Sequence, residues 1–289
     1  MISTLPVHQT LISTHNFENG DFMNKKFGFI GVGNMATAII GGMLKADFVA
    51  PQLINIFDLD TAKCDEFSQK GVTVVNSAND VVINSDIIVL AVKPQNYAEV
   101  LSAMSDINCD GKIFVSIAAG ISIAFVREQL KQDVKVVRVM PNTPLLLSKG
   151  ATAICPSENM SEDEFEPVKA MFALSGVVEI FEESHMNEII SVNGSSPAYV
   201  YLFAKAMVEY ADSCGIDKDK ALNLVCATFE GAAEMMRKSG DDIDTLIKKV
   251  SSKGGTTIEA LGYFDKNNFV DIVKGAMTAC TNRAEELGK

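Results

Sequence analysis

Residues 27–36 read FGFIGVGNMA, an apolar run that breaks into a glycine turn and restarts as a helix. The first five residues have the composition of a buried strand, and apolar residues recur at helical spacing over 34–46. The turn between them fits the pattern Gly31-x-Gly33-x-x-Ala36. In this pattern the first glycine permits a tight turn, the second lets the backbone approach a pyrophosphate, and the small third residue lets helix and strand pack closely. The stretch therefore predicts a strand–turn–helix unit that binds a dinucleotide.

The predicted contacts to the dinucleotide come from this turn and from the first helical turn, whose N–H groups attract a phosphate. An ordinary strand-to-helix turn would share the two glycines, but the apolar segments that flank the pattern favour the binding turn. The residues expected to contact the cofactor here are Gly31, Val32, Gly33, Asn34, Met35 and Ala36.

Asp58 closes the next apolar run, 53–57, and forms the second part of the dinucleotide pattern. In this fold class an acid at that place accepts hydrogen bonds from the adenosine ribose and repels a 2′-phosphate. A helix-capping or solvated aspartate is the alternative. Residues 59–62 supply no cation, and Lys63 lies far enough into the next helix to be able to point elsewhere. We therefore expect NADH or NADPH as the cofactor, with a preference for NADH.

Two later turns also follow apolar runs, where the carboxyl ends of strands in an open sheet meet the ligand crevice. One is expected to line the cofactor, although an ordinary surface lysine before a helix is the alternative. The other, residues 140–144, is a rigid polar turn that is equally consistent with a structural corner. The residues of the first turn are Ala91, Val92, Lys93 and Pro94.

The composition narrows the class of protein. A chain of 289 residues is long enough for two domains, and its net charge of −12 argues against nucleic acid and acidic membrane surfaces as partners. Any anionic substrate must therefore be held by local donors. The six cysteines include no C-x-x-C pair, which is typical of reduced thiols in the cytoplasm. The three histidines are too dispersed to predict a metal site, and no apolar run is long enough to span a membrane.

From residue 27 to about 182, strand-like runs alternate with helical stretches, which predicts a doubly wound parallel sheet. A capping box, Ser161-x-x-Glu164, predicts the start of the helix between the last two strands. The expected strands are 27–31, 53–58, 72–75, 86–92, 112–117 and 134–140, with 151–155 and 177–181 extending the far edge of the sheet.

Beyond Ser184 the alternation stops and long helical patterns follow. The fold class is therefore α/β, a Rossmann-type doubly wound sheet followed by an all-helical dimerisation domain. The expected helices of that domain are 195–214, 217–238, 241–250, 256–264 and 268–287. The expected domains are a disordered extension at 1–24, a dinucleotide-binding domain at 25–183 and a helical dimerisation and substrate domain at 184–289.

The segment 197–208 is apolar nearly all the way round. A helix without a polar face must be covered on every side, and about a hundred residues of helical domain can hardly cover it alone. The pattern therefore predicts a homodimer, with the central helix of a compact bundle as the alternative.

The second strong signal is the stretch 251–259, SSKGGTTIE. Its two glycines allow backbone N–H groups to converge on an anion, and Thr256-x-x-Glu259 is a capping box that predicts the start of a helix. Together they suit a small carboxylate, although a plain helix–helix turn is equally common. The residues expected to bind the substrate are Ser252, Gly254, Gly255, Thr256 and Thr257.

The chain presents no evident general acid: no histidine and no isolated pair of acids lies in a recognisable loop. A reaction that needs little help with protons would suit it, such as hydride delivery to an already electrophilic C=N bond. The chain resembles the pyrroline-5-carboxylate reductase family from about Lys26 to Leu287. The matching segments lie at 28–36, 91–94, 116–120, 138–144, 194–199 and 254–260.

The resemblance implies reduction of Δ1-pyrroline-5-carboxylate to L-proline by NADPH or NADH, in a homodimer interlaced through the helical domain, with larger rings in some members. Residues 91–94 would line the nicotinamide, the 252–257 loop would bind the substrate carboxylate, and Thr257 would be the catalytic residue that hydrogen-bonds the ring nitrogen. One departure is Lys253, where the family usually has proline. It reduces the expected stiffness of the loop and adds a positive charge near the carboxylate.

Two other functions compete with this interpretation. The β-hydroxyacid dehydrogenases share the two-domain plan, but they need a helical lysine followed four residues later by asparagine, and here Lys205 is followed by Glu209. A non-catalytic nucleotide-binding regulator would keep the fold but would have no reason to retain the Ser252–Thr257 loop.

Overall fold

A computed structural model describes residues 24–288. The expected extension at 1–24 lies outside these residues apart from Asn24. The described chain forms two compact units. One runs to Met186 and includes the residues from Glu286 onward, and the other spans Asn187–Glu285. The sequence pattern predicts this boundary at residue 183.

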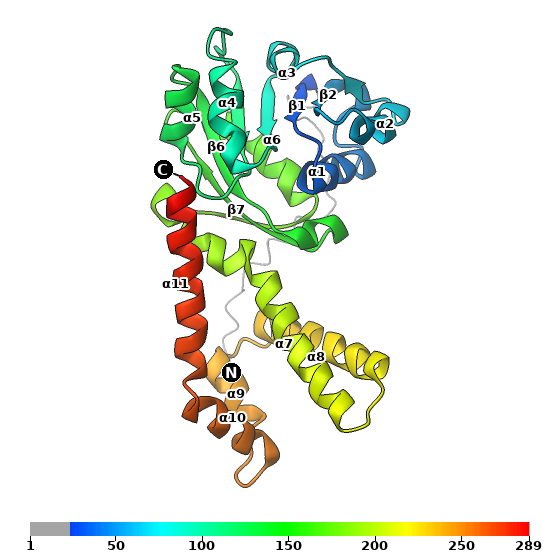
Figure 1. Ribbon diagram of the computed structural model, residues 1–289, viewed down its shortest axis with the longest axis vertical. Helices are drawn as coiled ribbons and strands as arrows, with labels where there is room; N and C mark the ends of the chain where they lie inside the picture. The colour runs from blue at the N-terminus through cyan, green and yellow to red at the C-terminus, as the bar shows by residue number, and fades with distance from the viewer. Residues whose placement is uncertain (1–23, 289) are drawn as a thin grey trace, which may run out of the picture. The chain divides into compact units, whose positions relative to one another are not determined.

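The first unit is built on an eight-stranded sheet in the order β3-β2-β1-β4-β5-β6-β7-β8 (Figure 1). Every residue of β1, β4 and β5 is buried, which explains their continuous apolar sequences. The strands are β1 (Phe27–Ile30), β2 (Ile54–Phe57), β3 (Thr73–Val74), β4 (Ile87–Leu90), β5 (Ile113–Ser116), β6 (Lys135–Met140), β7 (Gly150–Pro156) and β8 (Gly176–Ile180). The predicted strands are confirmed, although β2, β3, β4 and β5 are each two or three residues shorter than expected.

The strand order reverses between β1 and β4, and this switch point is where open sheets of this kind bind ligands. β1 pairs in parallel with β2 on one side and with β4 on the other. In the last row of this register, Ile30 lies beside Phe57 and Leu90. The three chains therefore leave the sheet together at its carboxyl edge.

One pairing differs from the expected parallel sheet: β7 runs antiparallel to β6. The link between them, which contains the short helix η4 (Thr143–Leu147), is too brief for the crossover that a parallel partner requires. β8 is again parallel to β7, because the helix α6 (Glu162–Ala173) provides a crossover. The capping box predicted at the start of α6 is confirmed, with Ser161 and Glu164 bonded reciprocally.

The helices of the first unit flank the sheet and complete its core (Figure 1). α1 contributes Ile39, Ile40 and Met43, which are almost fully buried against β1 and β2 residues. The other helices of this unit, besides α6, are α1 (Asn34–Lys45), α2 (Ala62–Gln69), α3 (Ala78–Asn84), α4 (Tyr97–Ser102) and α5 (Ile123–Leu130).

The second unit is helical, as predicted, and begins with a π-helical turn, η6 (Ile190–Gly194), that the sequence pattern does not indicate. Phe203 of α7 contacts the rings of Phe229, Phe264 and Phe269, so three other helices converge on it. The helices are α7 (Ser196–Ser213), α8 (Lys218–Lys238), α9 (Ile243–Lys249), α10 (Thr256–Lys266) and α11 (Phe269–Leu287).

The surface of α7 is the most apolar part of the second unit. Val200, Tyr201 and Leu202 expose 47%, 62% and 68% of their surface, and no residue of the helix is buried. A soluble chain rarely leaves such a patch in water, because burying it is favourable. The apolar helix predicted from the sequence therefore exists, and the described chain leaves it uncovered.

Candidate functional site

The glycine turn after β1 lies against the turn after β4. Gly31 has a φ of +95°, which only glycine adopts readily, and its N–H donates to the Phe57 carbonyl at 2.8 Å. A Cβ on Gly31 would stand 2.7 Å from the Ala91 carbonyl oxygen. The Ala91 N–H in turn donates to the Ile30 carbonyl at 2.9 Å. Two of the predicted cofactor segments are therefore brought together at the switch point.

Gly33 provides the test of whether a dinucleotide fits this turn. It is the N-cap of α1, and a Cβ built on it would meet no atom within 4 Å. Packing within the chain therefore does not require glycine there, whereas close approach of a pyrophosphate does. Gly33 also has no side chain to cap the first turn, so the N–H groups of Asn34 and Met35 are presented to an anion. Ala36 is fully buried, which meets the packing role predicted for it.

Asp58 follows β2 at the same edge of the sheet. Its Oδ2 accepts a hydrogen bond from the Val32 N–H at 2.7 Å, and its Oδ1 accepts one from the Asp60 N–H at 2.9 Å. Burial alone would raise the pKa of Asp58, but these two backbone N–H groups and the Lys63 ammonium together hold that pKa below its ordinary value. The acid is therefore a fixed carboxylate that is bonded to the glycine turn itself.

Lys63 lies closer to this site than the sequence suggested. Its Nζ is 3.4 Å from Asp58 Oδ1 and 3.8 Å from Asp60 Oδ2. The Lys63 side chain is 47% exposed, whereas that of Asp58 is 13% exposed. A cation is therefore present beside the acid, and it can move more freely than the acid can.

Tyr97 fixes the second cofactor segment, and sequence reasoning missed it. The fully buried Tyr97 hydroxyl donates to the Leu90 carbonyl at 2.6 Å and accepts from Ser116 at 3.3 Å. Burial raises the pKa of Tyr97, so the phenol stays protonated and keeps its donor. Leu90 and Tyr97 bracket the predicted residues 91–94. The exposed Lys93 precedes η3 (Pro94–Asn96), whose first residue is the proline predicted to start it.

The predicted substrate loop lies in the second unit, between α9 and α10. Gly254 has a φ of +73°, and the Gly255 N–H donates to the Ser252 carbonyl at 2.9 Å. A Cβ on Gly255 would stand 2.6 Å from Ser252 Oγ, so the turn is too tight for a larger residue. Ser252 and Lys253 are exposed, and Thr257 is half-buried.

The capping box predicted at Thr256 is wrong, although α10 does begin there. Gly255 is the N-cap, and no side chain caps the first turn. Because Thr256 is already the first helical residue, its hydroxyl is not in the N-cap position from which it would bond the third amide. The consequence favours anion binding, since the first amides of α10 lack a side-chain cap.

The polar turn after β6 has a structural role in the described chain. Asn142 is buried, and its Oδ1 accepts a hydrogen bond from the Ala151 N–H at 2.9 Å. It thereby joins the end of β6 to the start of the antiparallel strand β7. The sequence is consistent either with a turn that lines the ligand crevice or with a structural corner. The bond between Asn142 and Ala151 fits the structural corner.

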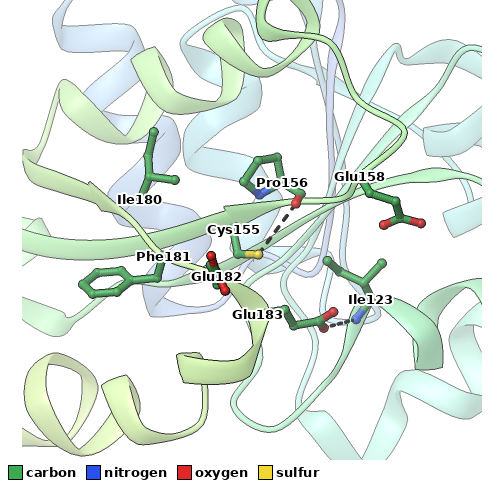
Figure 2. A pocket seen from close by; sticks show the side chains of 8 residues that line it. All are labelled: Ile123, Cys155, Pro156, Glu158, Ile180, Phe181, Glu182 and Glu183. Atoms are coloured by element: carbon green, nitrogen blue, oxygen red, sulfur yellow. Dashed lines mark hydrogen bonds between the residues drawn. The ribbon is translucent and has the colours of Figure 1, made fainter.

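An open cavity of about 440 Å³ lies elsewhere in the first unit, near the ends of β7 and β8 (Figure 2). Glu158, Glu182 and Glu183 lie on its lining, and the glycine turn does not. Three carboxylates would repel the phosphates of a dinucleotide. Burial raises the pKa of Cys155, which also lines it, to about 11, so that thiol is not a nucleophile at neutral pH. The cavity is therefore not the predicted cofactor site.

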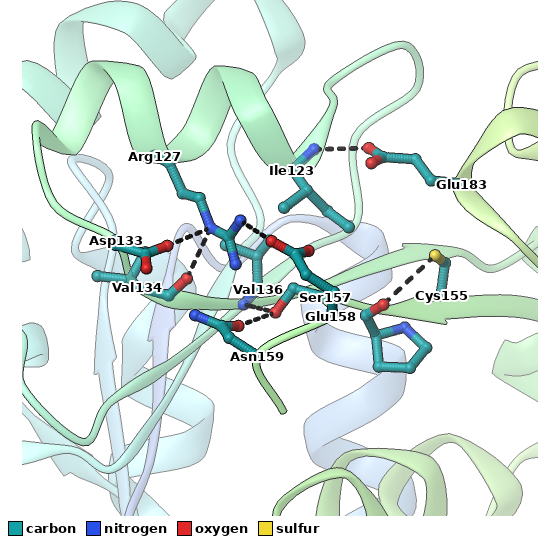
Figure 3. A network of polar contacts seen from close by, with 11 residues as sticks. Ile123, Arg127, Asp133, Val134, Val136, Cys155, Ser157, Glu158, Asn159 and Glu183 are labelled. Carbon is teal, nitrogen blue, oxygen red and sulfur yellow. Dashed lines mark hydrogen bonds and ion pairs between the residues drawn. The ribbon is translucent and has the colours of Figure 1, made fainter. Parts of the chain in front are cut away.

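A polar network beside this cavity holds α5 to the sheet (Figure 3). Arg127 pairs with Glu158 at 2.6 Å and with Asp133 at 3.2 Å, and its Nε donates to the Val134 carbonyl at 3.0 Å. Glu183 accepts from the Ile123 N–H at 2.7 Å, at the first turn of the same helix. These contacts hold α5 at both ends, while the buried Nη2 of Arg127 has no hydrogen-bond partner among the described residues.

The structure thus gathers the predicted cofactor residues in the first unit and the predicted substrate residues in the second. In the described part of the chain, no group of three or more His, Cys, Asp or Glu side chains is arranged to hold a metal ion. Over the same residues, no helix combines the length and apolar character needed to cross a membrane.

Comparisons with known proteins connect these features to two families. Residues 183–287 match the family described as pyrroline-5-carboxylate reductase dimerisation. Residues 26–120 match the family described as NADP oxidoreductase, coenzyme F420-dependent.

Individual relatives match over nearly the whole chain. Pyrroline-5-carboxylate reductase of Escherichia coli is 36% identical over 272 residues, which cover 92% of this chain and 100% of that protein. Pyrroline-5-carboxylate reductase 3 of Danio rerio is 35% identical and covers 94% of each chain. A crystal structure of pyrroline carboxylate reductase from Plasmodium falciparum, with NADP bound, superposes with a TM-score of 0.85 at 28% identity. It covers 92% of this chain and 99% of that one.

Proposed function

The chain belongs to the pyrroline-5-carboxylate reductase family, and we propose that it reduces Δ1-pyrroline-5-carboxylate to L-proline with a nicotinamide dinucleotide. The observation that supports this class of reaction is that the turns after β1, β2 and β4 meet at the carboxyl edge of the sheet, where Ile30 lies beside Phe57 and Leu90. The family supplies the substrate, and the uncapped start of α10 offers amides for its carboxylate.

The residues of the first unit would hold the cofactor. The Gly31–Ala36 turn would bind the pyrophosphate, Asp58 the adenosine ribose, and Ala91–Pro94 would line the nicotinamide. When bound, the reduced nicotinamide would supply a hydride to the carbon of the protonated C=N bond, the iminium, whose nitrogen already carries the proton that the product amine needs. The chain's own contribution is then mainly to orient donor and acceptor, which is consistent with the lack of an evident general acid.

The residues of the second unit would hold the substrate. The negative net charge does not attract an anionic substrate, so local donors must bind its carboxylate. The amides at the Gly254–Gly255 turn and the Ser252 hydroxyl provide them, and Thr257 would hydrogen-bond the ring nitrogen as the catalytic residue. The exposed Lys253 adds a positive charge beside this turn.

We also propose that NADH is preferred to NADPH. Asp58 is held as a carboxylate by two backbone N–H groups, and its position favours a ribose hydroxyl over a 2′-phosphate. Two like charges at contact distance in a partly solvated site repel by a few kcal/mol, roughly, before salt screening reduces the effect.

A homodimer is the proposed assembly. The uncovered apolar face of α7 and the match to a dimerisation family over 183–287 both support it. Larger assemblies remain compatible with the same face. All six cysteines are free thiols, which suits the reducing conditions of the cytoplasm as the proposed compartment.

The test of the reaction is the decay of reduced-nicotinamide absorbance with synthetic pyrroline-5-carboxylate. Turnover that depends on this substrate supports the proposal. Turnover of a β-hydroxy acid instead would support the dehydrogenase alternative. The structure speaks against that alternative, because Lys205 forms an exposed ion pair with Glu209 at 3.7 Å. Nucleotide binding without any turnover would support the regulator.

A further inference from the structure

We propose that Lys63 sets how far this chain accepts a 2′-phosphorylated nucleotide, by exchanging its ion pair with Asp58 for one with the phosphate. The inference rests on the proposed function only in requiring that the first unit binds a nicotinamide dinucleotide. In this proposal Asp58 disfavours NADPH relative to NADH, and Lys63 favours NADPH.

The contacts make the acid the fixed member of the pair and the lysine the movable one. Asp58 is bonded by two backbone N–H groups, at 2.7 and 2.9 Å. The Lys63 Nζ approaches it at 3.4 Å, which is long for a charge-assisted bond, and its side chain is about half exposed. A new anion at this edge of the sheet can therefore draw the ammonium away without disturbing the glycine turn.

The local charge balance shows why a movable cation matters. Asp58 and Asp60 place two carboxylates beside the predicted ribose position, and Lys63 pairs with both. Residues 59–62 contain no cation, and within α2 itself the basic residue is Lys63. A 2′-phosphate that entered this corner would meet net negative charge unless Lys63 turned toward it.

Helix stability alone does not explain where Lys63 lies. It occupies the first turn of α2, where the positive end of the helix dipole disfavours a cation. Lys70, at the other end of the same helix, lies where the dipole favours a cation and pairs with Glu66 at 2.6 Å. The two lysines are almost equally exposed, at 47% and 50%, so Lys70 is a matched control.

The experiment compares the wild-type chain with Lys63→Ala, Lys63→Arg and Lys70→Ala. Dissociation constants for NADH and NADPH are measured by nicotinamide fluorescence without substrate, at about 50 mM and about 300 mM salt. Lys63→Ala should raise the ratio of the NADPH constant to the NADH constant about tenfold, the effect of losing one exposed ion pair to a multiply charged phosphate. Lys63→Arg should keep the wild-type ratio, and so should Lys70→Ala.

The salt dependence is a second test. In Lys63→Ala only the repulsion between the acids and the 2′-phosphate remains, so higher salt should lower the ratio of the NADPH to the NADH dissociation constant toward the wild-type value. A ratio in Lys63→Ala within about twofold of the wild type, or an equal change in Lys70→Ala, would overturn the inference.

Failure of the proposed reaction gives a different result. Wild-type chain that binds both nucleotides but does not turn over pyrroline-5-carboxylate refutes the reaction and leaves the ratios to decide the role of Lys63. Wild-type chain that binds neither nucleotide refutes both proposals.

Discussion

The sheet unit and the helical unit differ in where their apolar side chains lie. Every residue of β1, β4 and β5 is buried, whereas α7, α9 and α10 contain no buried residue. The sheet unit completes its core within one chain. The helical unit leaves the apolar surface of α7 exposed within one chain, and a second copy of the chain is the simplest partner that could bury it.

The two candidate sites follow the same difference. At the sheet, the ligand groups are backbone atoms held by a buried framework, as the bond from Val32 to Asp58 illustrates. At the helices, the candidate groups lie on a turn whose neighbours are largely exposed. We therefore expect changes in the helical unit to have the larger effects on activity, because in the proposed dimer the geometry of its site would depend on assembly.

The largest effect should come from charging the uncovered helix. Leu202→Glu places a carboxylate on the most exposed aliphatic side chain of α7, and burying it in an apolar interface would cost several kcal/mol, roughly. Light scattering at micromolar concentration should show at least twice the chain mass for the wild type and the single-chain mass for this variant. We expect kcat/KM to fall by about 100-fold or more, as a loss of about 3 kcal/mol implies.

The matched control for Leu202→Glu is Ile83→Glu, a 60% exposed residue of the sheet unit. It should leave both the mass and the activity as in the wild type. A Leu202→Glu variant that is monomeric, folded and fully active would contradict the interface and the dependence of the helical site on it.

The second effect concerns the substrate turn. Thr257→Ala should lower kcat/KM by roughly one to two powers of ten, the loss of one or two hydrogen bonds to a charged ligand. Steady-state kinetics measure this, and the affinity for the nucleotide should barely change because its site lies in the other unit. Thr278→Ala removes an exposed threonine whose hydroxyl bonds the Lys274 carbonyl and should have no kinetic effect. Unaltered kinetics in Thr257→Ala would remove Thr257 from the site.

The third effect tests the sheet unit. We expect the wild type to prefer NADH about tenfold in kcat/KM, equivalent to about 1.4 kcal/mol. Asp58→Ser keeps a small polar group but removes the negative charge, so it should narrow or reverse the preference. Both cofactors are measured side by side with the same substrate. A wild-type preference for NADPH would mean that the Lys63 ammonium outweighs the acid.

The smallest effect lies on the surface of the sheet unit. The bond from Lys135, with that from the Ser161 N–H, lowers the pKa of Glu164 from 4.5 to about 2. This contribution to stability is complete above pH 4.5 and is lost as the pH falls toward 2. Since the Glu164 side chain is over a third exposed, Glu164→Gln should cost only about 1 kcal/mol at pH 7.

Urea unfolding at pH 7 and near pH 3 measures this change. The difference between Glu164→Gln and the wild type should shrink at the lower pH. Glu166→Gln, which removes an exposed partner of Lys169 on the same helix, is the control and should have a smaller effect at pH 7. A difference that grew with acidity would refute the sign of the pKa shift.

Much of the fold was predictable because its signals are local. The glycine turn at 31–36 and the alternation of apolar runs each follow from a few neighbouring residues. The direction of β7 was missed, since it depends on the length of a connection and not on the strand's own residues. The cap of α10 was missed because a shift of one residue places Gly255, and not Thr256, at the N-cap.

The site was predictable only where a residue's role is carried by its neighbours in sequence. Gly31 and Ala91 were expected at the same edge, and they meet there. Tyr97 was missed because an aromatic residue at a helix start looks like ordinary core, and only its bond to Leu90 shows what it holds. The direction of the Lys63 side chain does not follow from the sequence, because a long side chain is oriented by its partners, here Asp58 and Asp60.

The uncovered face of α7 has a consequence for how the protein reaches its native state. The sheet unit can acquire its core in a unimolecular step, whereas in the proposed dimer the exposed apolar face of α7 is stabilised when two chains meet. Refolding should therefore divide into a phase whose rate is independent of protein concentration and a later phase that accelerates with it. Dilution would then lengthen the time during which an apolar helix is open to self-association of the wrong kind, so the yield of native protein depends on the rate of encounter.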